Sequence, residues 1–291
     1  MSISNKYKQK INQLKLEYEQ LKQGKESLLD IIFEAELPEG VYNSNAIENS
    51  TLTIAETERI LLELDLAREV SLREVFEAKN LARVSEYIRK RALEKKIDQE
   101  VILLLHKMLL MNINEDIAGR WRLAGEYVRV GTHIAAAPEK IEGLIQKSLV
   151  DYESKPDDYF LDKITRFHLE FESTHPFVDG NGRIGRAIIN YQLFHLGFPP
   201  IIVRNKGKQK YYDGFKMFDQ KSETKPMEDI LLLALLESFH KRLAYLRGDK
   251  IVLLSEHAKR QKRSINTLLN AARRQTIPAF REKGVWKISN E

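Results

Sequence analysis

The chain has 291 residues, with 47 Lys and Arg against 42 Asp and Glu, a net charge of +5 and no cysteine. The lack of cysteine excludes disulfides, a thiolate nucleophile and cysteine-ligated zinc or iron–sulfur centres. We expect a cytoplasmic protein that does not bind a membrane. The polar N-terminus has no apolar stretch behind it, and no apolar run approaches the roughly 20 residues that a bilayer-spanning helix needs.

The first third of the chain has the composition of long helices, because glycine (14) and proline (8) are scarce overall. Residues 5–35 carry apolar side chains at steps of three and four, which predicts an amphipathic helix that Pro38 to Gly40 should end. Residues 54–92 contain neither glycine nor proline, so they are expected to form another helix. Residues 98–111 are apolar nearly all round, which indicates a buried central helix.

The segment from 119 to 137 has a different composition, with three glycines and weak alternation at 127–130, and it predicts a short β-hairpin. Helical patterns then resume. They cover residues 138–154, 156–173, 182–196, 211–218 and 226–247.

The C-terminal tail after Gly248 and Asp249 is basic. Between Lys259 and Lys287 it has nine Lys or Arg residues and one acidic residue, Glu282. A basic helix over 260–274, a turn at Gly284 and an apolar Trp286 resemble a small helix-turn-helix with a wing. Concentrated positive charge is typical of nucleic-acid binding. A solvated basic face packed on the preceding domain explains the tail equally well.

Residues 175–186, HPFVDGNGRIGR, form the strongest candidate for a functional site. Gly180 and Gly182 allow the backbone N–H groups to converge on an anion, and the helix that starts there adds its positive end. Arg183 and Arg186 are three positions apart and share one helix face, where an anion would relieve their repulsion.

Two further side chains of this segment suit phosphate chemistry. Asp179 offers the carboxylate oxygen that Mg²⁺ prefers at phosphate sites. His175 is the nearby group that can accept a proton near neutral pH.

HPFVDGNGRIGR resembles the signature of the Fic family, H-x-F-x-[DE]-G-N-G-R-x-x-R, with every specified position filled. The resemblance covers about residues 43–218. It implies an all-α protein with a mainly helical Fic, or Fido, core and a β-hairpin flap. It also implies a protein adenylyltransferase, a nucleotidyltransferase that moves AMP from ATP, with Mg²⁺, to a Ser, Thr or Tyr hydroxyl of a target protein docked at the flap.

The resemblance also assigns roles within the loop. His175 would be the catalytic base, Asp179 would hold Mg²⁺, and Arg183 and Arg186 would bind the β- and γ-phosphates, while Phe177 would face the core. The implied nucleotide-binding residues are Asp179, Gly180, Asn181, Gly182, Arg183, Ile184, Gly185 and Arg186 of the loop, Val130, Gly131, Thr132 and His133 of the flap, and Tyr211 and Tyr212 beyond it.

A second motif lies far upstream. Residues 44–49, SNAIEN, resemble the inhibitory motif of the family, [ST]-x-x-x-E-[GN]. The resemblance implies that Glu48 pairs with Arg186 in the resting enzyme and that Ser44 and Asn49 hold the helix that presents it. A serine followed by a glutamate is also a common helix start, which would explain the pattern without any inhibition.

Two other functions stay open at this point. Glu48 could position a water that removes AMP from a modified protein, or the chain could be a DNA-associated regulator that senses nucleotide with little turnover. The target protein and the oligomeric state are not determined by the sequence, and a homo-oligomer is compatible with it. The expected organisation is a helical N-terminal region at 1–97, a Fic core at 98–248 and the basic tail at 249–291.

Overall fold

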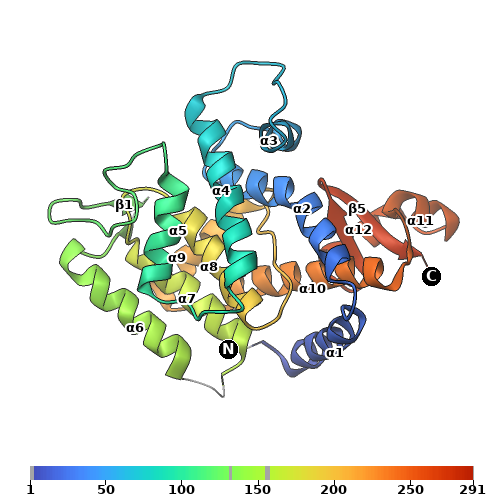
Figure 1. Cartoon of the computed structure of the whole chain (residues 1–291). Coiled ribbons are helices and arrows are strands. Elements are labelled where there is room, and N and C mark those ends of the chain that lie inside the picture. The colour runs from blue at the N-terminus through green and yellow to red at the C-terminus, as the bar shows by residue number, and fades with distance from the viewer. Residues whose placement is uncertain (1–2, 131–132, 155–157, 291) are drawn as a thin grey trace.

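The computed structural model describes residues 3–130, 133–154 and 158–290, and helices make up most of it (Figure 1). Among these residues, no helix combines the length and the apolar character needed to cross a bilayer. The helices of the first part are α1 (Asn5–Leu21), α2 (Glu26–Ile47), α3 (Ile54–Leu61), α4 (Leu72–Arg91) and α5 (Gln99–Leu110).

The middle of the chain holds a short antiparallel hairpin and the helices around it. Its elements are β1 (Arg129–Val130), β2 (His133–Ile134), the 3-10 helix η1 (Pro138–Lys140), α6 (Ile141–Ser154), α7 (Phe160–Thr174), α8 (Asn181–His195), α9 (Lys208–Lys221) and α10 (Lys225–Arg247). The hairpin predicted within 119–137 is therefore confirmed, although Gly131 and Thr132 lie outside the described residues.

Helix α8 is the centre of the fold, because it contributes to two hydrophobic clusters. Ile184 and Tyr191 pack with α4, α5 and α7, while Ile189 and Leu193 pack with α1, α7 and α10. All four side chains are at most 1% exposed. The helix predicted at 98–111 is confirmed as α5, and it packs against α4 and α8. The rigid position of α8 fixes the loop that precedes it.

The predicted N-terminal helix boundaries were wrong in one respect that matters for function. The helix expected over 5–35 is two helices, and α2 continues through Pro38 and Gly40 to Ile47. Proline in a helix removes one N–H donor, which normally ends or kinks the helix. Here tertiary contacts outweigh that cost, since Glu39 is 2% and Val41 1% exposed.

The helix expected over 54–92 is also two helices, α3 and α4, joined by a loop at 62–71. Glu63 adopts a positive φ of 56° after α3, and the Ser71 side chain accepts a hydrogen bond from the backbone of Glu74 to cap α4. Neither device needs glycine or proline, so composition did not reveal the break.

The C-terminal residues form a small unit with its own core and a three-stranded sheet of order β3-β5-β4. Its elements are β3 (Lys250–Leu253), α11 (Leu254–Arg260), α12 (Ile265–Arg273), β4 (Ala279–Glu282) and β5 (Val285–Asn290). The single basic helix predicted over 260–274 was wrong, because Lys262 takes a φ of 50° and Ser264 starts a new helix. The unit lies beside α2 and α10 (Figure 1).

Candidate active site

The loop between α7 and α8 is held in shape by its own residues. His175 ends α7 in the left-handed conformation, with φ 49°, and Gly180 precedes α8 with φ 83°. The Asn181 side chain bridges the loop: its Oδ1 accepts from the Phe177 N–H and its Nδ2 donates to the Phe177 carbonyl, both at 2.8 Å. The first turn of α8 thus has a defined position, with its N–H groups at the surface of the site.

A buried histidine on α5 packs against the loop, and the sequence pattern did not indicate it. The His106 ring stacks on Phe177 at 3.6 Å between centroids. The Gly119 N–H donates to His106 Nδ1 at 3.0 Å, so Nε2 carries the proton and donates to the Asp179 carbonyl at 3.0 Å. Burial lowers the pKa of His106 to about 4, which keeps it neutral. The sequence feature that could have indicated this support is a single histidine within the apolar run 101–110.

Arg122 is a second support that the sequence did not reveal. Its side chain is 2% exposed and donates to the carbonyls of His175 at 2.9 Å, Glu126 at 2.8 Å and Ala136 at 2.6 Å. Arg122 therefore joins the active-site loop to both ends of the hairpin segment.

On one side of the site, the carboxylate of Asp179 pairs with two arginines. Asp179 Oδ2 lies 2.6 Å from Arg73 Nη2, and Oδ1 lies 3.0 Å from Arg183 Nη2. Although burial alone would raise it, these guanidinium groups hold the pKa of Asp179 below its ordinary value. Arg183 is 4% exposed and also pairs with Glu77 at 3.0 Å. Nothing in the sequence pattern indicated Arg73 or Glu77.

A cavity of about 440 Å³ lies over this loop. Ligand pockets of proteins span roughly 300–1,000 Å³, so the space suits a small ligand. Its walls are Glu48, Asn49, Ser50, Thr51, Arg73, Glu74, Glu77, His175 and residues 178–183. Burial lowers the pKa of His175 to about 4. Its imidazole is therefore neutral near neutral pH and able to accept a proton.

The upstream motif meets the loop at the edge of this cavity. Glu48 Oε1 lies 2.8 Å from Arg186 Nη2, and Ser44 accepts from the same guanidinium through its Oγ at 3.0 Å and its carbonyl at 2.8 Å. A Cβ on Gly182 would overlap with Glu48 Oε1. Glu48 thus occupies the space above the first turn of α8. Asn49 accepts a hydrogen bond from Lys208 at 2.9 Å.

Other residues expected at the nucleotide lie away from the cavity. The Ile184 side chain is in the core, and Gly185 faces Glu172 and His168. The Tyr211 hydroxyl is 2.7 Å from His168 Nε2 beneath Arg186, and the Tyr212 hydroxyl donates to the Ile47 carbonyl at 2.6 Å.

Of the described flap residues, His133 lies at a second cavity and Val130 does not. Val130 is 47% exposed on β1. His133 Nε2 is 2.8 Å from the Ser173 carbonyl, and His133 lines a cavity of about 360 Å³.

The loop fits a magnesium ion that is shared with phosphates. Such an ion takes one or two carboxylates and completes its shell with phosphate oxygens and water. Asp179 is a carboxylate with a lowered pKa at the cavity wall. Its partner Arg73 is 59% exposed and also pairs with Glu77 at 3.1 Å. Asp179 would hold the ion when a phosphate ligand is present.

The structure is that of a mainly helical protein with a cavity over the start of its central helix α8. Residues 96–193 match the model of the Fic/DOC family. The chain is 31% identical over 178 residues to protein adenylyltransferase Fic of Nematostella vectensis, and this match covers 60% of the chain and 41% of that protein. The corresponding protein of Drosophila melanogaster is 31% identical over 185 residues, covering 62% of this chain and 37% of its own length. The chain thus spans about two fifths of the curated relatives that it matches.

Two solved structures share the fold. A Fic domain containing signaling protein from Bacteroides thetaiotaomicron has a TM-score of 0.74 and 23% identity, and the match covers 82% of this chain and 97% of that one. A Fic family protein from Desulfovibrio desulfuricans has a TM-score of 0.67 and 21% identity over 93% of this chain and 88% of the other. The second match extends over most of the chain.

Proposed function

We propose that the chain transfers AMP from ATP to a hydroxyl group of a target protein. The observation that carries the proposal is the assembly of His175, Asp179 and the start of α8 around one cavity of about 440 Å³. Relatives that share about 31% of their residues over the matched segment are named protein adenylyltransferase Fic, which supports the same chemistry here.

In the proposed reaction, neutral His175 accepts the proton of the target Ser, Thr or Tyr hydroxyl. The hydroxyl oxygen then bonds to the α-phosphorus, and the bond to the β-phosphate oxygen breaks to release pyrophosphate. The N–H groups at the start of α8 and the Arg183 guanidinium stabilise the negative charge on the phosphates. Mg²⁺, held at Asp179, would neutralise phosphate charge when bound.

The target would dock beside the hairpin. Strands β1 and β2 form a two-stranded sheet, and an extended segment can add to the edge of such a sheet through main-chain hydrogen bonds. The neighbouring cavity of about 360 Å³ is lined by His133, Ile134 and Phe218, among others. It would receive side chains that flank the modified residue.

We further propose that Glu48 restrains the reaction. Its carboxylate pairs with Arg186 at 2.8 Å and lies where Gly182 leaves room above the first turn of α8. A γ-phosphate that binds to Arg186 must displace this carboxylate or accept its repulsion. An α-phosphate displaced from in-line attack loses orders of magnitude in rate.

The test compares ATP labelled at the α-phosphate with ATP labelled at the γ-phosphate, using the Glu48→Gly variant. Protein labelled only from the α position supports AMP transfer, whereas label from the γ position means phosphate transfer and contradicts the proposal. Adding His175→Ala should reduce labelling by about 10²- to 10⁴-fold while ATP still binds, because the phosphate-binding groups are untouched.

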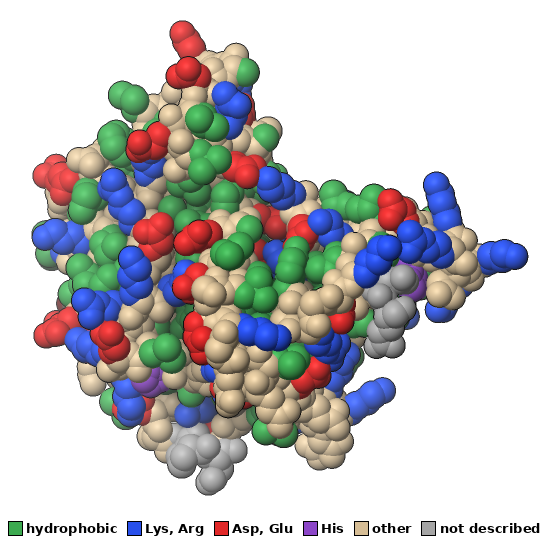
Figure 2. All heavy atoms as spheres, turned by 45° about the vertical axis from the view of Figure 1, so that its right-hand side comes forward, with side chains coloured by type: hydrophobic (Ala, Val, Ile, Leu, Met, Phe, Trp, Pro, Cys, Tyr) green, Lys and Arg blue, Asp and Glu red, His purple; other side chains and the backbone are tan. Residues whose placement is uncertain are grey.

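A second function, DNA binding by the C-terminal unit, is favoured by the exposed face of α12. Asn266, Thr267 and Asn270 are exposed on it. Asparagine on the second helix of a helix-turn-helix can hydrogen-bond adenine in the major groove. Exposed basic residues flank this face and gather over the unit (Figure 2). They are Lys259, Arg260, Lys262, Arg263, Arg273 and Arg274.

The full chain should then bind a mixed-sequence DNA duplex at low salt. Changing Arg273 and Arg274 together to Gln should lower the slope of log K against log salt by about 2, one for each lost phosphate contact. A chain that does not bind DNA even at low salt would exclude this second function.

A further inference from the structure

Helix α2 has two functional faces. Near its C-terminal end, Ser44 and Glu48 contact Arg186 of α8. Earlier in the same helix, Glu39 and Asn43 accept hydrogen bonds from the backbone of Lys283 and Asn205, which lie outside the loop 175–186. Glu48, the C-cap of α2, lies nine positions after Glu39, a distance of roughly 13 Å along the axis. A contact at Glu39 can therefore fix the angle at which α2 delivers Glu48.

The partner of Glu39 is the tight turn between β4 and β5. Glu39 Oε2 accepts from the Lys283 N–H at 3.0 Å, and Oε1 accepts from the Gly284 N–H at 2.9 Å. Lys283 and Gly284 both have positive φ, 48° and 80°, which points their N–H groups the same way. Consecutive N–H groups in such turns form an anion-binding concavity. Glu39, at 2% exposed, fills it.

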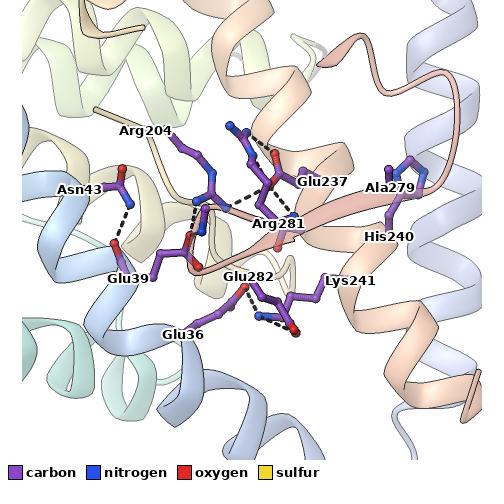
Figure 3. A network of polar contacts seen from close by, with 12 residues as sticks. Glu36, Glu39, Asn43, Arg204, Glu237, His240, Lys241, Ala279, Arg281 and Glu282 are labelled. Atoms are coloured by element: carbon purple, nitrogen blue, oxygen red, sulfur yellow. Dashed lines mark hydrogen bonds and ion pairs between the residues drawn. The ribbon is translucent and has the colours of Figure 1, made fainter. Parts of the chain in front are cut away.

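Buried ion pairs extend this contact to α10 (Figure 3). Arg204 pairs with Glu39 and, at 2.9 Å, with Glu237, which also binds the Arg281 guanidinium at 2.5 Å. Glu237 is 7% exposed. Removing one member of a buried pair leaves an uncompensated charge, so this network resists rearrangement.

A second set of pairs ties α2 to the same unit. Glu36 of α2 lies 2.6 Å from Arg242 and 3.1 Å from Lys241, and Lys241 lies 3.5 Å from Glu282 of β4. Although burial acts to raise it, Arg242 and Lys241 hold the pKa of Glu36 below its ordinary value. The Glu36 carboxylate is thus ionised and bound. Glu39, on the same part of α2, is bound by the β4–β5 turn.

From these contacts we infer that Glu39 is a positioning residue for Glu48. The C-terminal unit, through its β4–β5 turn, sets how firmly the carboxylate of Glu48 is held on Arg186. The inference rests on the proposed function, in which Glu48 restrains AMP transfer. It gives the basic tail a role in the enzyme that does not depend on DNA.

Hydrogen exchange of the full chain tests the coupling without any activity. In Glu39→Gln, the amides of residues 41–48 should exchange roughly tenfold faster, the change expected when one charge-assisted hydrogen bond is lost. Glu58→Gln is the matched control. Glu58 binds the same turn through the Lys283 side chain at 2.7 Å, but it lies on α3. Exchange over 41–48 should not change in this variant.

Gly284→Ala provides a second, milder perturbation. A Cβ there meets no atom within 4 Å, so the variant should fold with strain only at its positive φ of 80°. It should also speed exchange over 41–48. Unchanged exchange in both Glu39→Gln and Gly284→Ala would overturn the inference.

Labelling with ATP then separates a positioning role from a merely structural one. Glu39→Gln should raise self-labelling in the wild-type background and add nothing when Glu48 is already Gly. An equal gain in both backgrounds would contradict action through Glu48. If Glu48→Gly itself fails to raise labelling while exchange responds to Glu39→Gln, the proposed restraint fails and the coupling of the unit to α2 stands.

Discussion

Glu48 Oε1 lies 2.8 Å from Arg186 Nη2 although 138 residues separate the two in sequence. The Arg186 side chain is 6% exposed and the Glu48 side chain 37%, so the arginine is fixed and the carboxylate is the member that can leave. Arg186 Nη1 has no hydrogen-bond partner in the described part of the chain. In the proposed function, a phosphate oxygen of bound ATP would accept a hydrogen bond from Arg186 Nη1.

Replacing Glu48 with Gly should raise self-labelling or target labelling from α-labelled ATP at least tenfold. The change removes both the competing carboxylate and its repulsion of the γ-phosphate, and a misplaced reacting group can cost about 10²-fold in rate. Initial rates of labelling measure the effect.

The matched control is Glu48→Gly combined with Arg186→Ala. This double variant should lose the gain, because the freed arginine is what binds the phosphate. If the Glu48→Gly variant labels at the wild-type rate, Glu48 does not restrain the reaction and residues 44–49 only end helix α2. Loss of AMP removal from a modified target in the Glu48→Gly variant would instead assign Glu48 to the hydrolysis of the AMP–protein bond.

Chelation of divalent metal should abolish transfer and leave the unfolding temperature of the nucleotide-free protein unchanged. Asp179 already has Arg73 and Arg183 as partners at 2.6 Å and 3.0 Å, so the loop does not depend on a metal for its shape. Thermal unfolding with and without EDTA, beside a labelling assay, measures both effects. A drop in unfolding temperature with EDTA would show a structural ion instead.

His106→Ala should destabilise the protein by about 2–4 kcal/mol and lower the labelling rate. The change removes two hydrogen bonds and the stacking on Phe177 and leaves a buried cavity below the loop. Denaturant unfolding gives the free energy. Leu104→Ala, on the same helix but 40% exposed, is the control and should cost much less.

The active loop could be predicted because its chemistry is contiguous. Residues 175–186 carry His175, Asp179, the glycines and both arginines within one loop and one helix start. The supporting residues could not be predicted in this way. Arg73 reaches Asp179 across 106 residues and Arg122 reaches His175 across 53, and such contacts leave no local pattern.

The helix boundaries failed for a related reason. Local propensity placed a stop at Pro38, but the buried partners of Glu39 lie 244 and 245 residues further along the chain. Tertiary contacts of this kind override local preference. The same contacts accompany the continuation of α2 to Ile47, and residues so far apart in the sequence leave no local pattern that would predict it.

The pH dependence of stability should follow five buried groups that are uncharged near neutral pH. Burial lowers the pKa from 6.5 to about 4 for His106, His175 and His240 and to about 3 for His168. It raises the pKa of Glu172 from 4.5 to about 8. Each shift means that the folded and unfolded chains bind different numbers of protons over a defined pH range.

Stability should therefore pass through a maximum near pH 7, where the proton excess of the unfolded histidines equals the one proton that folded Glu172 keeps. Between pH 6.5 and about 4 the unfolded chain binds more protons at the four histidines, so stability falls as pH falls. Between about pH 7 and 8 the folded chain keeps the proton on Glu172 that the unfolded chain has lost, and the unfolded histidines have lost most of theirs, so stability falls as pH rises. Denaturant unfolding at a series of pH values measures both limbs. Glu172→Gln should flatten the alkaline limb, and His240→Gln, away from the active loop, should reduce the acid slope by at most about 1.4 kcal/mol per pH unit. An alkaline limb that persists in Glu172→Gln would contradict the assignment.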